Sequence, residues 1–194
     1  MKKTITPVIG DKVIIELFRD ELITEEYASW LRDNKINKYL VSGSNTTSLY
    51  EIASYVKALQ EKEDDFLFAV ISKNDNIHIG NARLQITEQE LKIGKFGMMI
   101  GNPNYHGKGI GTEVVRLVLK IAFEDLKLHK VFLEVVADNI PAIRIYEKNG
   151  FIVEGSIKNK YCKNNQFQDF LIMSILLRND TFPKNFVLER DNCG

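Results

Sequence analysis

The sequence predicts a single α/β (α+β) domain in which a mixed, mostly antiparallel sheet is flanked by helices. Apolar residues follow strand-like and helix-like periods in the order β–α–α–β–β–β–α–β–α–β–β. Short turns join the early strands, which favours antiparallel pairing, whereas a later strand–helix–strand unit favours one parallel crossover. The length of 194 residues fits one domain, so we expect residues 1–194 to fold as one unit with an irregular tail over 179–194.

The first half of the chain predicts one strand, two helices and a hairpin. Thr24 is a helix N-cap residue followed by two glutamates, and Ser48 and Glu51 have the spacing of a capping box. The expected elements are a strand over 12–18, a helix from 24 to about 33, a helix over 49–62, and strands over 66–72 and 78–87 around a turn at 73–76.

The second half alternates between the two periods. Apolar residues recur at helical spacing over 112–127, and Pro141 and Gly150 bracket a short helix. The expected elements are strands over 92–101, 130–136, 151–155 and 170–178, and helices over 112–127 and 141–149.

Composition excludes several classes of function. Lys plus Arg equals Asp plus Glu at 26 each, so the net charge argues against broad capture of nucleic acid or an anionic membrane. No apolar run is long enough to span a membrane. Cys162 and Cys193 are far apart without metal-ligand spacing, and neither a disulfide framework nor a metal site is expected. These features predict a cytoplasmic protein.

A glycine-rich loop opens the long helix. Residues 105–113 read YHGKGIGTE, with Gly107, Gly109 and Gly111 alternating before the helical period begins. Glycines let the backbone approach a ligand, and the helix start presents unpaired N–H groups and partial positive charge. A diphosphate fits such a site. The spacing differs from a Walker A loop and from a Rossmann fingerprint, and a turn without a ligand remains the alternative.

Three blocks of the sequence together resemble the GNAT superfamily of N-acetyltransferases. The loop resembles the family motif of Arg or Gln followed by x-x-G-x-G/A, with His106 in the Arg/Gln slot. Residues 133–151 (LEVVADNIPAIRIYEKNGF) resemble the family's strand, Asn, Tyr-bearing helix and Gly-Phe. Residues 96–101 (FGMMIG) are similar to the strand before the loop. The chain looks most like the branch with ribosomal-protein, spermidine and amino-sugar acetyltransferases.

The resemblance implies acetyl-CoA as the acetyl donor. It implies a pantetheine arm paired along the strand that ends at Gly101, a diphosphate on the glycine loop, and contacts from the short helix. The implied donor-binding residues are Met99, Ile100, Gly101, His106, Gly107, Lys108, Gly109, Ile110, Gly111, Thr112, Asn139, Ala142 and Tyr146. For Asn139, a helix cap is the alternative.

The resemblance also implies catalytic roles for two residues. Tyr146 is expected to donate a proton to the departing sulfur. Many relatives carry a glutamate base two residues before the glycine at position 97, but Lys95 occupies that slot here. Glu134 lies within the apolar strand KVFLEVV, where burial would raise its pKa toward a useful range, so it is the candidate base. The alternatives are an ion pair on the sheet surface and a water relay.

The acceptor side is expected to involve the N-terminal helical region and the last hairpin. Trp30 and Tyr39, or Tyr161 and Asp169, could line an acceptor pocket, with core packing as the alternative for Trp30. His78 and His129 are expected at the surface or at strand ends.

The sequence therefore predicts acetyl transfer to a primary amine. A small molecule such as an amino sugar or a polyamine is favoured as acceptor, and a protein N-terminus is the alternative. Lys95 and His106 leave open a CoA-binding module without catalysis, and an oxidoreductase is disfavoured by the glycine spacing. Relatives commonly form homodimers, so a homodimer is a further expectation.

Overall fold

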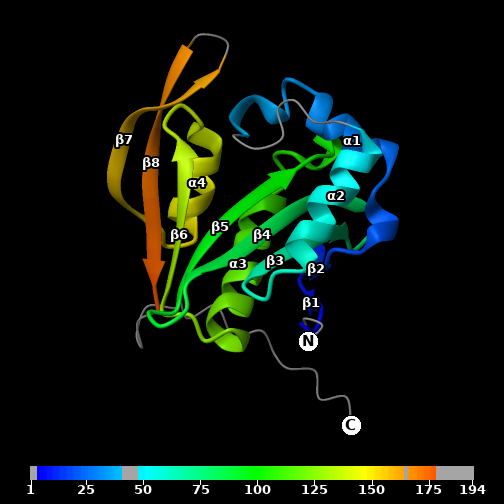
Figure 1. The fold of residues 1–194 in the computed structure, drawn as a ribbon, viewed down its shortest axis with the longest axis horizontal. Helices are drawn as coiled ribbons and strands as arrows, with labels where there is room; N and C mark the ends of the chain where they lie inside the picture. Colours follow the sequence, from blue (N-terminus) through cyan, green and yellow to red (C-terminus); the bar gives the residue numbers. More distant parts are fainter. Residues whose placement is uncertain (1–3, 41–47, 164–165, 178–194) are drawn as a thin grey trace.

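The computed structural model describes residues 4–40, 48–163 and 166–177. These residues form one eight-stranded sheet in the order β1-β2-β3-β4-β5-β6-β8-β7 (Figure 1). Neighbouring strands are antiparallel except β5 and β6, which are parallel. The predicted mixed, mostly antiparallel sheet with one parallel crossover is confirmed.

The strands are β1 (Val8–Ile9), β2 (Val13–Leu17), β3 (Asp65–Ser72), β4 (His78–Glu88), β5 (Ile93–Ile100), β6 (Lys130–Val136), β7 (Ile152–Lys163) and β8 (Gln166–Leu176). The helices are α1 (Glu25–Arg32), α2 (Leu49–Gln60), α3 (Ile110–Lys120) and α4 (Ile140–Lys148). Three short 3₁₀ segments lie at Asp20–Leu22, Asn37–Tyr39 and Pro103–Tyr105, and a π-helical turn at Ile121–Asp125 continues α3.

Helices α1 and α2 have the N-terminal caps that the sequence predicts. The Thr24 hydroxyl accepts the backbone N–H of Tyr27 at the start of α1. At the start of α2, Ser48 and Glu51 exchange side-chain and backbone hydrogen bonds in a capping box. These contacts satisfy N–H groups that have no partner within the helix.

Two apolar cores lie on opposite faces of the sheet. Helices α3 and α4 pack on one face with a cluster that includes Phe68, Leu84, Leu117 and Leu133. Helices α1 and α2 pack on the other face against Leu67, Ala69 and Ile71 of β3. Alternate residues of β3 therefore serve different cores, which explains why this strand is apolar throughout and buried along its whole length.

The sequence-based element bounds are wrong in three places. Strand β7 extends to Lys163 and β8 starts at Gln166, so the last hairpin is much longer than predicted. The prediction relied on alternating apolar residues, and the polar outer half of this hairpin lacks that alternation. Helix α3 begins at Ile110 instead of Thr112, and the two-residue strand β1 was not predicted. The predicted tail over 179–194 lies outside the described residues.

Candidate active site

The sheet is split between its two parallel strands. Strands β5 and β6 pair only from Ile93 with Lys130 to Lys95 with Phe132, and beyond that point they diverge (Figure 1). Within the described part of the chain, β5 from Phe96 to Ile100 pairs only with β4. Backbone groups on the free edge of β5 therefore face the split, where an extended ligand can pair with them.

The glycine loop lies at the end of β5 and leads into α3. Gly107 and Gly109 adopt positive φ angles of 73° and 79°, and Gly109 is the N-cap residue of α3. A Cβ at Gly107 would meet no atom within 4 Å, so the loop borders open space. The first N–H groups of an eleven-residue helix point out of this end. The loop therefore has the geometry and the partial positive charge that a diphosphate requires.

Two candidate donor-binding residues beside the loop, His106 and Gly101, contact neighbouring parts of the protein. The His106 ring nitrogen Nε2 lies 2.8 Å from the Ile100 carbonyl oxygen, so His106 ties the loop back to the end of β5. A Cβ at Gly101 would lie 2.0 Å from the Trp30 ring. Glycine is therefore required at position 101 to let the end of β5 pass over Trp30.

Helix α3 approaches α4 and β5 closely at its first turn. A Cβ at Gly111 would lie 2.9 Å from Ile145 of α4 and 3.3 Å from Met98 of β5. Gly111 therefore has a packing role in addition to its place in the loop. Ile110 is buried and Thr112 is half-buried at the same turn.

Lys12 brings a second ammonium group to the loop, and sequence reasoning missed it. Its Nζ donates to the Lys108 carbonyl oxygen over 2.7 Å and lies 3.3 Å from the position of a Cβ on Gly109. The buried carboxylate of Glu113 in the first turn of α3 accepts the Lys12 backbone N–H over 2.9 Å. No sequence signal joins these positions, because they are about a hundred residues apart.

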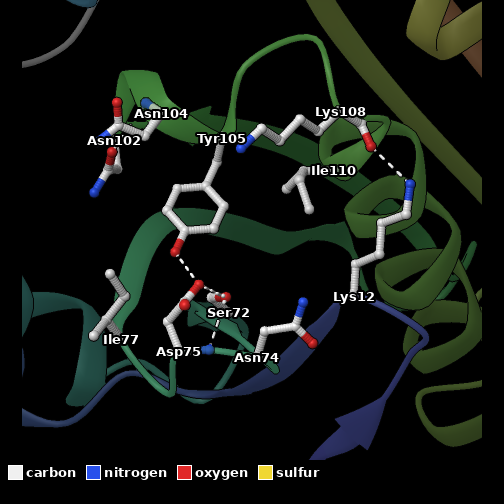
Figure 2. Close-up of a pocket in the computed structure, with 10 residues that line it drawn as sticks. All are labelled: Lys12, Ser72, Asn74, Asp75, Ile77, Asn102, Asn104, Tyr105, Lys108 and Ile110. Atoms are coloured by element: carbon white, nitrogen blue, oxygen red, sulfur yellow. Dashed lines mark hydrogen bonds between the residues drawn. The ribbon is translucent and has the colours of Figure 1, made fainter.

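A polar pocket of about 520 Å³ lies beside the loop, on the side of β2, β3 and the β3–β4 turn. Figure 2 shows Lys12 beside the Lys108 carbonyl, the Lys108 side chain extending toward the Tyr105 ring, and the Tyr105 hydroxyl pointing to Asp75. Hydrogen bonds from Tyr105 and Ser72 hold the pKa of the Asp75 carboxyl below its usual value. The Lys108 ammonium lies 5.6 Å from the centroid of the Tyr105 ring.

Tyr146 lies in the α3–α4 core beside the split. Its ring centroid is 6.3 Å from that of Phe96, the first β5 residue beyond the pairing with β6, and 5.7 Å from that of Phe151. Burial raises the pKa of its phenol above the ordinary value. The hydroxyl therefore stays protonated at neutral pH and can donate a hydrogen bond.

Asn139 caps α4. Its side-chain oxygen accepts the Ala142 backbone N–H over 3.4 Å, so the alternative of a helix cap is realised. Pro141, near the start of the helix, lacks an N–H that would need a partner. The cap sets the direction in which α4 leaves β6 and thereby places Tyr146 about two turns later.

Glu134 forms ion pairs with two lysines. Its Oε2 is 2.5 Å from the Lys95 ammonium nitrogen, and its Oε1 accepts a hydrogen bond from Lys160. Partial burial acts to raise the pKa of the Glu134 carboxyl, but Lys160 and Lys95 outweigh it and hold the pKa below its ordinary value. The expectation of a raised pKa is therefore wrong, and the ion pair left open by the sequence is formed.

The expected acceptor residues differ in their surroundings, and two of them, Tyr39 and Asp169, contact the β6–α4 turn. Trp30 is 4% exposed and belongs to the α1–α2 core, so its core alternative is realised. The Tyr39 hydroxyl donates to the Asp138 carbonyl oxygen at 3.4 Å, which links the N-terminal region to the β6–α4 turn. Asp169 accepts from Lys158 and from the Asn159 backbone within the last hairpin, and these hydrogen bonds lower its pKa. Tyr161 is half-buried opposite Gln168.

His78 is the half-buried first residue of β4, so the expected strand-end position is confirmed, and its ring belongs to an aromatic cluster. Its ring centroid is 5.0 Å from that of Trp30 and 5.6 Å from those of Phe18 and Tyr27. Burial lowers its pKa, although hydrogen bonds from its Nε2 to the Asn81 side-chain oxygen and the Gly80 carbonyl oxygen oppose the shift. The neutral ring is therefore favoured inside this cluster.

A split sheet with a glycine loop at the open edge can hold an extended ligand that ends in a diphosphate, as the resemblance to N-acetyltransferases implies for an acyl-CoA. The family model for the acetyltransferase (GNAT) domain matches residues 12–152. The chain is 32% identical over 150 residues to an N-acetyltransferase 9-like protein of Caenorhabditis briggsae, covering 73% of this chain and 74% of that protein. The chain belongs to the GNAT acetyltransferase family. It is an N-acetyltransferase, and acetyl-CoA is the acetyl donor.

Two further comparisons involve polyamine enzymes. The spermidine N(1)-acetyltransferase of Escherichia coli K12 is 38% identical over 77 residues, which is 40% of this chain and 41% of that enzyme. The structure of spermidine N-acetyltransferase from Vibrio cholerae in complex with CoA and spermine superposes with a TM-score of 0.78 at 22% identity, covering 86% and 96% of the two chains. That likeness supports the fold.

Two further kinds of feature are absent from the residues that the structure describes. No cluster of His, Cys, Asp and Glu there is arranged to hold a metal ion. No helix in those residues combines the length and the apolar character that a membrane crossing needs.

Proposed function

We propose that the protein transfers the acetyl group of acetyl-CoA to the primary amine of a small molecule. The observation that carries the proposal is the split between β5 and β6, with the glycine loop at one end and Tyr146 beside it. The acceptor classes proposed are amino sugars and polyamines, and a protein N-terminus is the alternative. Residues 1–194 are proposed to act as one domain.

The donor is proposed to be held by backbone groups. N–H groups of the loop and of the first turn of α3 bind the diphosphate, with Lys12 and Lys108 adding positive charge. The free edge of β5 from Met99 to Gly101 pairs with the pantetheine arm, and the N–H of Met99 or Ile100 stabilises the oxyanion of the tetrahedral intermediate, since the Gly101 N–H already donates to the Ile79 carbonyl oxygen over 2.9 Å. Ala142 and the start of α4 border the same arm.

The chemical step is proposed to use Tyr146 and water. The neutral amine attacks the thioester carbonyl carbon, the tetrahedral intermediate collapses, and the carbon–sulfur bond breaks. Tyr146 donates a hydrogen bond to the departing sulfur, because its raised pKa keeps the phenol protonated. The lysine-paired Glu134 is a weakened base, so the amine proton leaves through water.

The test is release of free CoA thiol from acetyl-CoA by the purified protein. The panel contains amino sugars, polyamines, amino acids and short peptides with free N-termini. Thiol release that depends on a small amine, with the acetylated amine found by mass spectrometry, supports the proposal. Release only with peptides favours the alternative, and CoA binding without release with any amine favours a module that lacks catalysis.

A further inference from the structure

Three charged side chains form a linked group on one face of the sheet. Lys95 of β5 and Lys160 of β7 each donate to a different oxygen of Glu134 of β6. We name these residues the Lys–Glu–Lys cluster. Two ammonium groups and one carboxylate leave the cluster with a surplus of positive charge.

The cluster lies on the face that carries α1 and α2. Met99, four residues after Lys95 on the same side of β5, packs against the α1–α2 core. Leu133 and Val135 point into the opposite core, so Glu134 between them points to the α1–α2 face. The cluster and Tyr146 are therefore on opposite faces of the sheet, at the same split.

Open space borders the cluster. Lys95 is the last β5 residue that pairs with β6, and Gly97 follows on the same face. Gly97 is exposed, and a Cβ there would meet no atom within 4 Å. The proposed donor occupies the loop side of the split, so an acceptor that enters from the α1–α2 face reaches the thioester beside the cluster.

Aromatic rings hold the two lysines in place. The Lys95 ammonium is 5.9 Å from the centroid of Phe132, and the Lys160 ammonium is 5.3 Å from that of Phe170. The Lys95 and Lys160 side chains remain 41% and 30% exposed, whereas Glu134 is 19% exposed. Both ammonium groups therefore still present donors to a ligand from solvent.

We propose that the Lys–Glu–Lys cluster binds an anionic group of the acceptor, so that the preferred substrate is a small primary amine that also carries a phosphate or a carboxylate. This inference rests on the proposed function. A phosphate or carboxylate accepts hydrogen bonds from the surplus ammonium charge. A polyamine brings further ammonium groups against Lys95 and Lys160, and like charges repel.

The test compares matched acceptors that differ in one anionic group. Glucosamine 6-phosphate against glucosamine tests a phosphate, glutamate against glutamine tests a carboxylate, and spermidine tests a polycation. We expect the anionic member of at least one pair to exceed its neutral partner and spermidine in kcat/KM by about tenfold. The pair that shows the preference identifies the source of the anion.

Variants assign the preference to the cluster. We expect Lys95→Gln and Lys160→Gln each to raise KM for the anionic acceptor by about fivefold to tenfold, with kcat and the KM for acetyl-CoA little changed. Lys130→Gln is the matched control. Lys130 lies on the same face at the start of β6, and its ammonium pairs with Glu154 at 2.7 Å, so this variant should keep the preference. Thermal unfolding of each variant checks that it is folded.

Three results overturn the inference. One is equal or higher kcat/KM for the neutral members of both pairs. Another is a preference that survives in both cluster variants. The last is acetylation of spermidine with no turnover of either anionic amine, which leaves the proposed transferase activity standing. Absence of thiol release with every amine would remove the proposed function as well.

Discussion

At the scale of single residues, Tyr146 is the side chain proposed to act as the acid in the chemical step. Its phenol is buried and protonated beside Phe96, where β5 leaves β6. We expect Tyr146→Phe to lower kcat by about 10²-fold, because the hydrogen bond to the departing sulfur is lost while the ring packing remains. Steady-state kinetics and calorimetric titration of CoA measure the two effects separately. Unchanged kcat would exclude Tyr146 as the acid.

Glu134 is expected to keep lysines in place without accepting the amine proton. Lys160 and Lys95 hold its pKa low, so its carboxylate is a poor base near neutral pH. We expect Glu134→Gln to change kcat at saturating acceptor by less than about fivefold and to leave the shape of the pH–kcat profile unchanged. A fall of about 10²-fold or more, together with loss of the acidic limb, would instead identify Glu134 as the base.

His78 makes stability depend on pH in a defined window. Burial lowers its folded-state pKa below the ordinary 6.5, although Asn81, Gly80 and the charge of Glu26 oppose the shift. Below about 6.5 the unfolded chain takes up a proton that the folded state resists. His78 therefore contributes stability that is fully present above the unfolded-state pKa and is lost as the pH falls through the folded-state pKa.

Thermal unfolding between pH 7 and pH 5 tests this prediction. We expect the melting temperature of the wild-type protein to fall across this window and that of His78→Gln to change less. The carboxyls whose pKa values are lowered, including Glu134 and Asp169, change the stability of the protein only below their ordinary pKa values, which are near 4. Their titration therefore lies below the pH window of this test. Equal pH dependence of the two proteins would contradict the account of the aromatic cluster.

At the scale of elements, the junction between the glycine loop and α3 is the proposed phosphate site. Gly109 caps α3 with a φ of 79°, which costs an L-residue about 1–2 kcal/mol. We expect Gly109→Asp to weaken CoA binding by more than tenfold, because it adds strain and a negative charge beside the diphosphate. Isothermal titration with CoA measures the change.

Gly155→Asp is the matched control for added charge. Gly155 lies in β7, has no positive φ, and a Cβ there would meet no atom within 4 Å. Wild-type affinity in this variant and lost affinity in Gly109→Asp would support the loop as the site. Retained affinity in Gly109→Asp would remove that assignment.

The sequence predicted the helices, strands and loops whose characteristic residues lie within one short stretch of the chain. Glycine spacing and helical period located the loop and α3, and Pro141 with Gly150 bracketed α4. The long hairpin of β7 and β8 was underestimated because its outer half is polar on both faces. Burial of Trp30 beneath Gly101 depends on a tertiary contact that no local pattern encodes.

For the candidate site too, the sequence predicted only the parts that depend on a local pattern of residues. The loop and Tyr146 carry recognisable spacing, whereas the ion pairs of Glu134 join residues from three strands. Lys12 reaches the loop where the carboxylate of Glu113 accepts its backbone N–H and so links the start of β2 to α3. Contacts across such separations are set by the topology of the sheet.

At the scale of the whole molecule, the divergence of β5 and β6 gives the two faces of the sheet different roles. The α3–α4 face carries the glycine loop and Tyr146, and the α1–α2 face carries the Lys–Glu–Lys cluster. The split connects the two faces (Figure 1). Donor and acceptor are thus proposed to meet at the split from opposite faces, which is the central claim about this molecule.

The most direct test is thiol release from acetyl-CoA measured with and without amine for the wild-type protein, Gly109→Asp and Tyr146→Phe. We expect amine-dependent release with one acetylated amine per thiol for the wild type. We also expect saturating acetyl-CoA to restore activity partly in Gly109→Asp but not in Tyr146→Phe. Wild-type release that does not depend on amine, or full activity in both variants, would contradict the proposed meeting of donor and acceptor at the split.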